Sequence, residues 1–350
     1  MKPGRDFIAS LGVRTGLLGA FGRLGGGTAA HGLRVLAYHR VLPAADEHGF
    51  EHDLELVSAW EDDFDWQMRH VARHYEVITC HDLARLLDAG RPVPRRALII
   101  TFDDGFRDNH QIALPILRRH GVPAAMYVAT GYLDREDLFW FDGLVHDVLQ
   151  SRSATLPLGN ENIALGDTPD ARRQAAQDAL QQLKRMPDAQ RVQALQRIRQ
   201  ALGATAPVPS MPQSLHGPMN WSQVRELSDA GMEIGSHSVS HPVLAQVEDD
   251  ERLQRELVDS KVAIERHTGR PVVSLAYPVG GPGAYDDRVV AATRDAGYRF
   301  AFTYAAGPNR LGDGDRYRMK RLAVERYVPR SRFAAMLAAP PLFAYRWFQD

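Results

Sequence analysis

The chain contains a single cysteine, Cys80, among 350 residues. A lone cysteine excludes a disulfide within the chain and leaves the redox compartment undecided. Its position after the short apolar stretch 77–79 favours a small buried side chain. Long apolar runs are also missing, because none reaches the roughly 18 residues that a membrane-spanning helix needs. We therefore expect no transmembrane span.

An excess of charge of one sign is missing too. The 42 Lys and Arg residues nearly balance the 43 Asp and Glu residues, which leaves a net charge of -1. No cluster of basic residues is interleaved with aromatic ones, as it would be on a surface that binds nucleic acid. We therefore expect no nucleic-acid partner.

Both ends of the chain carry apolar side chains. In residues 1–30 these are interrupted by Arg5, Arg14 and Arg23, so we expect an amphipathic helical extension rather than a secretory signal peptide. Residues 331–350 form an apolar tail that either packs back on the domain or contacts a membrane or a partner. The expected location is the cytoplasm or the inner face of the membrane, with peripheral contact through one of these ends left open. The oligomeric state is left open as well.

Short β-rich runs alternate with helical patterns over residues 31–330. This alternation predicts an α/β domain with a mostly parallel sheet, and a parallel barrel of about 200 to 250 residues commonly forms one domain. Residues 58–75 read as a helix. Between about 151 and 218, helices at 171–186 and 188–202 predict a helical insertion. The insertion is either a packing appendage, a wall of a substrate groove or a dimer contact.

The most informative motif is Thr-Phe-Asp-Asp-Gly at 101–105, which directly follows the apolar run 97–100. Two carboxylates at the end of a buried strand add nothing to a core and therefore indicate a site. Asp103 and Asp104 would point to opposite faces of a regular strand, but Gly105 permits a turn that brings both to the strand end. Taken alone, Asp-Asp-Gly is most often a capped turn.

Two histidines four residues apart, His237 and His241, follow another short apolar run, 232–234. With one carboxylate they would form a set of ligands suited first to zinc, and otherwise to cobalt, nickel or ferrous iron. Three protein ligands leave a coordination position for water, and a second carboxylate then serves as general base. Such a pair also occurs by chance on exposed helices, so it is the combination with the paired carboxylates that indicates a metal site.

A third motif, Leu-Ala-Tyr-Pro-Val-Gly-Gly at 275–281, again follows a strand-like run. Together the three motifs resemble those of the polysaccharide deacetylases of the NodB-homology family, also called carbohydrate esterase family 4. The resemblance runs from about residue 33 to about residue 328. It implies a distorted (β/α) barrel and a metal-dependent hydrolase that removes N-acetyl or O-acetyl groups from a polysaccharide or its glycan precursor.

The resemblance also implies roles for single residues. Asp103 would be the general base, and Asp104, His237 and His241 would bind the divalent metal. The backbone amide of Val279 would donate to the oxyanion of the tetrahedral intermediate.

Other residues of the implied substrate site are less distinctive. Tyr277 and Pro278 precede Val279 in the third motif. Trp221 matches a motif whose aromatic side chain packs beside the site, although its place at the start of an expected helix, 222–230, suits core packing equally well.

The chain departs from the family pattern in two places. Many members have an arginine in the third motif that orients the catalytic carboxylate, and here Ala276 stands there. A late histidine usually supplies the general acid, but the last histidine of this chain is His267. His39, at the end of the apolar run 33–38, is similar to the histidine that poly-N-acetylglucosamine deacetylases carry near the front. Its imidazole suits acid catalysis at neutral pH, and the alternative is a structural histidine.

Two other functions stay open. A non-catalytic carbohydrate-binding protein would explain Ala276 and the missing late histidine, but it would not need three metal ligands and Asp103. A metal-dependent amidohydrolase that acts on a small non-glycan amide would use the same residues in a differently shaped groove.

Overall fold

The computed structural model describes residues 32–44, 47–135, 137–159, 161–204, 215–310 and 315–344. The expected N-terminal extension, 1–30, lies outside these residues, as does the end of the apolar tail, 345–350. In the described part, seven parallel strands close into a barrel in the order β1-β12-β11-β10-β9-β6-β5, and β5 pairs back with β1. The predicted (β/α) barrel is confirmed. Its strands are β1 (Arg34–Tyr38), β5 (Ala97–Phe102), β6 (Ala125–Val128), β9 (Glu233–Ser236), β10 (Ser274–Ala276), β11 (Phe300–Ala306) and β12 (Met319–Ala323).

Three further pairings lie beside the barrel. The short strand β4 (Glu76–Val77) extends the sheet at β5. Strands β2 (Arg40–Leu42) and β3 (Val57–Trp60) pair in parallel, and β7 (Thr155–Leu158) and β8 (Glu161–Ala164) form an antiparallel hairpin. The helix expected over 58–75 therefore begins later, because residues 57–60 are strand β3 and α3 is Glu61–His74.

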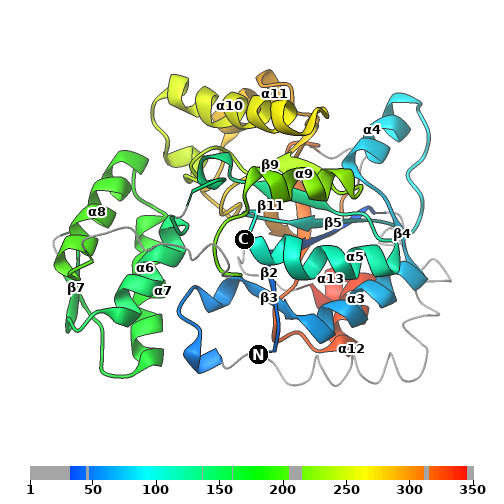
Figure 1. Ribbon diagram of the computed structural model, residues 1–350. Helices are drawn as coiled ribbons and strands as arrows, with labels where there is room; N and C mark the ends of the chain where they lie inside the picture. Colours follow the sequence, from blue (N-terminus) through cyan, green and yellow to red (C-terminus); the bar gives the residue numbers. More distant parts are fainter. Residues whose placement is uncertain are drawn as a thin grey trace.

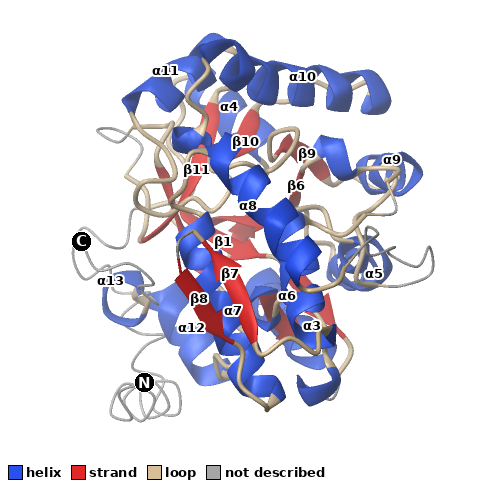
Figure 2. Cartoon of the chain, turned by 90° about the vertical axis from the view of Figure 1, so that its left-hand side faces the viewer, coloured by secondary structure: helices blue, strands red, loops and turns tan. Residues whose placement is uncertain are grey.

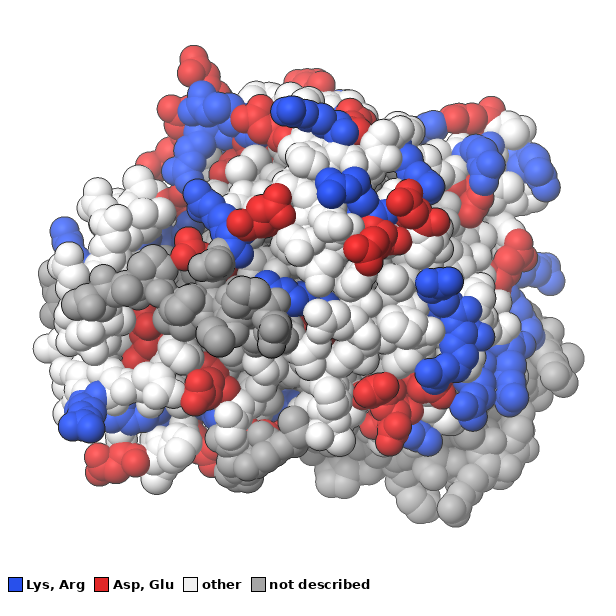
Figure 3. All heavy atoms as spheres, viewed as in Figure 1, with Lys and Arg blue, Asp and Glu red and all other residues white. Residues whose placement is uncertain are grey.

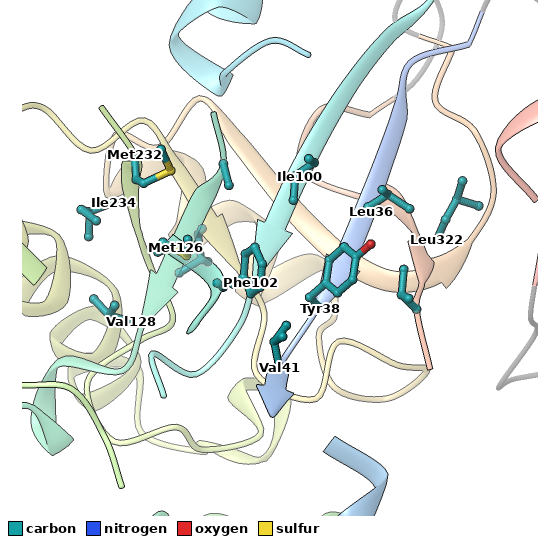
Figure 4. Packing of buried hydrophobic residues seen from close by; sticks show 14 of the residues in the cluster. Leu36, Tyr38, Val41, Ile100, Phe102, Met126, Val128, Met232, Ile234 and Leu322 are labelled. Atoms are coloured by element: carbon teal, nitrogen blue, oxygen red, sulfur yellow. The ribbon is translucent and has the colours of Figure 1, made fainter. Parts of the chain in front are cut away.

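Alternation along the strands separates two cores. Leu36, Tyr38, Ile100 and Phe102 pack between the barrel and the surrounding helices (Figure 4). The alternate strand positions, such as Val35, belong to a second cluster that fills the barrel, and α4 (Cys80–Asp88) closes the cluster with Cys80 and Leu83. Cys80 is fully buried, as its sequence context predicts.

The helices that surround the barrel follow the strands along the chain (Figure 1). Besides α3 and α4 they are α5 (Leu114–His120), α9 (Trp221–Asp229), α10 (Asp250–Thr268), α11 (Asp287–Asp295), α12 (Arg330–Ala338) and α13 (Pro340–Phe343). Phe333, Met336 and Phe343 of the last two helices join the main core, so this part of the apolar tail packs on the domain.

The helical insertion stands at one end of the barrel (green in Figure 1), and in Figure 2 it lies in front of the strands. It contains α6 (Trp140–Gln150), the β7–β8 hairpin, α7 (Pro169–Leu183) and α8 (Asp188–Ala201). Helices α7 and α8 match the two helices that the sequence predicts. The insertion has a core of its own, in which Phe139 and Leu144 pack against Ala176, Ala179 and Leu180 of α7.

Charges of both signs are interspersed over the molecular face shown in Figure 3. None of the helices in the described residues combines the length and the apolar character needed to cross a lipid bilayer.

Candidate active site

The candidate residues gather where barrel strands end. His39 follows β1, Asp103 and Asp104 follow β5, and His237 follows β9. Because the strands are parallel, their carboxyl ends meet at one edge of the barrel, where such barrels carry their catalytic groups. The spacing of two residues along β5 places Asp103 on the same side as Thr101, toward the barrel interior. The structure brings His39, the two carboxylates and the two histidines together around one cavity.

Asp104, His237 and His241 form a compact set of candidate metal ligands, called the ligand set below. Each offers one donor atom, and these atoms lie within 4.8 Å of one another. The Nε2 atoms of His237 and His241 lie 3.3 Å and 3.1 Å from Oδ1 of Asp104. The Nδ1 atom of His237 lies 2.8 Å from the carbonyl oxygen of Ala276, and a proton donated there leaves Nε2 free to bind a metal.

The donor chemistry fits a divalent cation. Two imidazole nitrogens and one carboxylate are common zinc ligands. All three residues are buried, and Oδ2 of Asp104 has no hydrogen-bond partner among the described residues. A buried carboxylate oxygen without a partner is costly in a protein interior, and a cation at this point would compensate it.

The loops that carry the ligands have unusual backbone conformations. Asp104 has a φ of 73° and His241 a φ of 53°, and Ser238 and Val279 are also in the left-handed region, with φ of 65° and 66°. Among the described residues other than glycine, Asp134 alone shares this feature. Such strain concentrates at functional sites. The predicted turn thus begins one residue before Gly105, at Asp104 itself.

The buried carboxylate of Glu256, on α10, holds the loop between the two histidines. Its Oε2 accepts hydrogen bonds from the backbone amides of Val239 and Ser240, at 2.9 Å and 2.8 Å. The hydroxyl of Ser238 accepts a hydrogen bond from the amide of His241. These contacts fix the backbone of the loop that carries His241.

Asp103 has a partner that the sequence did not reveal. Arg321, from the middle of β12, donates two hydrogen bonds of 2.7 Å to the carboxylate of Asp103. The same guanidinium donates to the carbonyl of Thr303, and both Arg321 and Asp103 are buried. Arg321 thus occupies the role expected of the arginine that Ala276 replaces. The signal in the sequence was an arginine at an inward position of the short strand 319–323, in which the only other charged residue, Lys320, is exposed.

The environment of Asp103 keeps it ionised. Burial alone would raise the pKa of its carboxyl, but the charges of Arg321 and His237 and the Arg321 hydrogen bonds outweigh burial and lower it. A carboxylate held in its basic form beside the ligand set is suited to accept a proton from water.

His39 lines the same cavity as the ligand set. Its Nε2 lies 3.9 Å from Oδ2 of Asp103, and its ring lies 5.6 Å from the ring of Tyr304. The backbone is held on both sides, because the amide of His39 donates to the hydroxyl of Ser58 and its carbonyl accepts from the side chain of Asn109. Burial lowers the pKa of His39, and the charges of Asp104 and Asp103 partly offset this. Its role as the general acid stays a prediction.

Of the three residues of the third motif that were expected at the substrate site, one lines the cavity. Val279 lines the cavity, whereas Tyr277 and Pro278 do not appear in its wall. The buried Tyr277 side chain stacks on Tyr285 and donates to the carbonyl of Tyr317. Trp221 is likewise absent from the wall: its indole stacks on His267 with 3.9 Å between ring centroids, and it packs in the main core. Trp221 is therefore a core residue, the alternative to a place beside the site. Tyr277 packs beneath the loop that carries Val279.

The cavity has a volume of about 620 Å³, enough for a sugar unit. The ligand set and Asp103 line it together with Phe141 of α6 and the loop 279–284. Helix α7 of the insertion and the residue that follows it supply another part of the wall, with Gln177, Gln181 and Lys184. Of the alternatives for the insertion, the structure therefore supports the groove wall.

Comparisons with known proteins agree with this geometry. A family model described as polysaccharide deacetylase matches residues 90–301, more than half of the chain. The putative polysaccharide deacetylase YxkH of Bacillus subtilis (strain 168) is 25% identical over 96 residues, which are 27% of this chain and 31% of that protein. The match thus spans about a third of that relative.

Solved structures share the fold at low sequence identity. The Streptococcus pyogenes deacetylase PplD in complex with acetate has a TM-score of 0.56 at 17% identity, over 88% of this chain and 97% of that chain. IcaB from Ammonifex degensii has a TM-score of 0.54 at 17% identity, over 88% and 97%. A polysaccharide deacetylase from Bacillus cereus has a TM-score of 0.55 at 21% identity, over 87% and 69%. With the family model, these findings show that the chain belongs to the polysaccharide deacetylase family, whose members are hydrolases.

Proposed function

We propose that this chain is a metal-dependent hydrolase that removes N-acetyl or O-acetyl groups from a polysaccharide or its glycan precursor. The observation that carries the proposal is the placement of Asp104, His237 and His241 beside an ionised Asp103 at the floor of one cavity. The similar PplD, a deacetylase whose structure is in complex with acetate, supports a reaction that releases acetate.

Each residue of the site has a separate role, which its surroundings determine. A divalent metal held by Asp104, His237 and His241, with zinc as the first candidate, would supply a Lewis acid that polarises the substrate carbonyl. Asp103, fixed by Arg321, takes a proton from the attacking water. His39 returns a proton to the departing amine, and the amide of Val279 donates to the developing oxyanion.

Acetate release from a panel of substrates tests this proposal. The panel contains N-acetylated polymers and oligosaccharides, precursor sugars, O-acetylated glycans and small non-glycan amides, each with metal-loaded and chelator-treated enzyme. We expect metal-dependent release from the glycans. Release from the small amides alone would favour the amidohydrolase alternative, and specific glycan binding without release would favour a carbohydrate-binding protein.

Substitutions of the two neighbouring carboxylates distinguish the general base from the metal ligand. Asp103→Asn should keep the metal but lower the rate by roughly 10²-fold or more, because the proton acceptor is lost. Asp104→Asn should instead weaken metal binding, measured by metal content after dialysis. His110→Ala, a histidine outside the cavity wall, is the control. Equal loss of metal in both Asp variants with the fold intact would contradict the assigned roles.

A further inference from the structure

Helix α7 presents a polar stripe to the candidate active site. Gln177 and Gln181 lie one turn apart on α7, Lys184 and Arg185 follow its last residue, Leu183, and all four line the cavity. The opposite face is apolar and packs in the core of the insertion, through Ala175, Ala176, Ala179, Leu180 and Leu183. The stripe is therefore fixed toward the cavity by the burial of the other face.

The contacts of the insertion keep this wall in place. The side chain of Gln177 donates a 2.7 Å hydrogen bond to Asp53 across the cavity rim. The indole of Trp140 in α6 donates a 3.1 Å hydrogen bond to the carbonyl oxygen of the ligand His241. At the start of α8, the buried Asp188 pairs with Arg252 of α10. The wall is thus tied to the rim, to the ligand loop and to a barrel helix.

Charged groups around the cavity differ in whether they have partners. Asp53 accepts hydrogen bonds from Gln177 and from the amide of Glu55, and Glu55 lies 3.4 Å from Arg326. Asp103 is paired with Arg321. By contrast, in the described residues the ammonium of Lys184 has neither a hydrogen-bond partner nor a carboxylate within 4.0 Å.

The side chain of Lys184 is half-buried in the cavity wall, and an anion in the cavity would give its ammonium a charged partner. Burial lowers the pKa of Lys184, and the charges of Asp53 and Asp104 only partly offset this. A lysine at the C-terminal end of a helix interacts favourably with the helix dipole, but an exposed side chain would serve that purpose as well. A metal at Asp104 would add positive charge to the same cavity, so Lys184 gains no counter-charge from the loaded site.

We propose that Lys184 binds an anionic group of the glycan, a carboxylate or a phosphate on the unit next to the acetylated sugar. Gln181 and Arg185, on the same stripe, contact the hydroxyls and the charge of that unit. This inference rests on the proposed function and names its substrate class: an acidic glycan or a phosphate-linked glycan precursor.

The test compares three substrates that share the same N-acetylated sugar: a neutral oligosaccharide, one with a neighbouring uronic acid and one with a phosphate diester or diphosphate at that position. We expect wild-type kcat/KM to be higher on one of the anionic substrates than on the neutral one. Lys184→Gln should reduce this ratio by roughly 10-fold, because a hydrogen bond to a charged group is lost, and Lys184→Arg should retain most of it. The ratio should also fall with added salt. Lys320→Gln, at an exposed position outside the cavity wall, is the matched control and should leave the ratio unchanged.

The outcomes separate the inference from the proposed function. The uronic acid and phosphate arms show which source of negative charge is used. A wild-type enzyme without preference, or an equal loss on all three substrates in Lys184→Gln, would overturn the role of Lys184 while the deacetylase activity stands. Absence of acetate release from every glycan would refute the proposed function itself.

Discussion

At the scale of single residues, the central pair is Asp103 and Arg321. A buried carboxylate is costly unless a partner compensates its charge, and two parallel hydrogen bonds from one guanidinium are among the strongest available. Arg321 reaches Asp103 from β12, across the barrel interior, and also donates to the backbone of β11 at Thr303. The geometry therefore fixes both the charge and the direction of the proposed base.

Replacing Arg321 by Gln should change the pH dependence of the reaction. Burial raises the pKa of Asp103 once the guanidinium is gone, so the acidic limb of the kcat/KM profile should move to higher pH. The rate at neutral pH should fall by roughly 10-fold or more, with metal content retained. Arg321→Lys keeps the positive charge but cannot donate two parallel hydrogen bonds. Its acidic limb should therefore lie between those of the wild type and Arg321→Gln. An unshifted acidic limb in folded Arg321→Gln enzyme would contradict the role of Arg321.

His39 is expected to protonate the leaving group. His39→Ala should leave metal content and melting temperature unchanged but lower turnover on N-acetylated sugars by roughly 10²-fold. The defect should be smaller on activated aryl acetates, whose leaving group needs less protonation. A lowered melting temperature with the same rate loss on both substrates would instead indicate a structural histidine.

At the scale of secondary-structure elements, the loop after β10 sets the position of Val279. Gly280 has a φ of 61°, and a Cβ atom there would lie 2.9 Å from the backbone nitrogen of Tyr304 and 3.1 Å from the carbonyl oxygen of Tyr277. The carbonyl of Gly280 accepts a 2.7 Å hydrogen bond from the amide of Tyr304. The loop is thus clamped between its own strand and β11.

Gly280→Ala should therefore displace Val279 and lower turnover as well as stability. The left-handed conformation costs alanine about 1 kcal/mol, and the close backbone contacts add to this. The matched control is Gly269→Ala at the end of α10, where φ is 67° and no atom lies within 4 Å of the added Cβ. Urea unfolding and acetate-release rates for both variants check this. Equal effects on turnover would show that the contacts at Gly280 do not position the loop.

How far the sequence predicts these elements depends on how local the signal is. Asp103 and Asp104 adjoin each other and follow an apolar run, so both the strand and the site could be predicted. Arg321 could not be assigned, because its partner lies 218 residues away and only closure of the barrel brings β12 beside the end of β5. The predicted helix 58–75 includes three residues of strand β3 for a similar reason: the strand is stabilised by pairing with β2, which lies outside any local pattern. Trp221 matched a motif, but its neighbours in the fold decide where the ring packs.

At the scale of the whole molecule, a buried charge network joins the barrel to the insertion. Arg40, just after His39, contacts Asp108 beyond β5 and Asp142 in α6, each at 3.3 Å. All three side chains are fully buried. Asp142 also accepts a hydrogen bond from the amide of Asp53 on the cavity rim. One guanidinium thus serves two carboxylates, and the insertion is held at the barrel by charges that are sensitive to pH.

This network predicts how stability depends on pH. Burial, only partly offset by Arg40, raises the pKa of Asp142 to about 7 and that of Asp108 to about 6, from an ordinary value of 3.8. The folded state therefore holds more protons than the unfolded state between about pH 4 and pH 7, and the contribution of these groups to the free energy of unfolding falls as pH rises through that window. Since one pKa unit corresponds to about 1.4 kcal/mol, the two shifts together amount to roughly 7 kcal/mol at most.

Asp142→Asn should remove part of this dependence, because the amide cannot ionise. Urea unfolding of the wild type and of Asp142→Asn, at pH 5, 6, 7 and 8 and with the same chelator, gives the difference between the two free energies. Other titrating groups, including the metal ligands, cancel in that difference when they are unaffected by the substitution. We expect the variant to gain stability relative to the wild type as pH rises from 5 to 8. A difference that is constant over this range would mean that Asp142 stays ionised throughout, and the single charge of Arg40 would then suffice for both carboxylates.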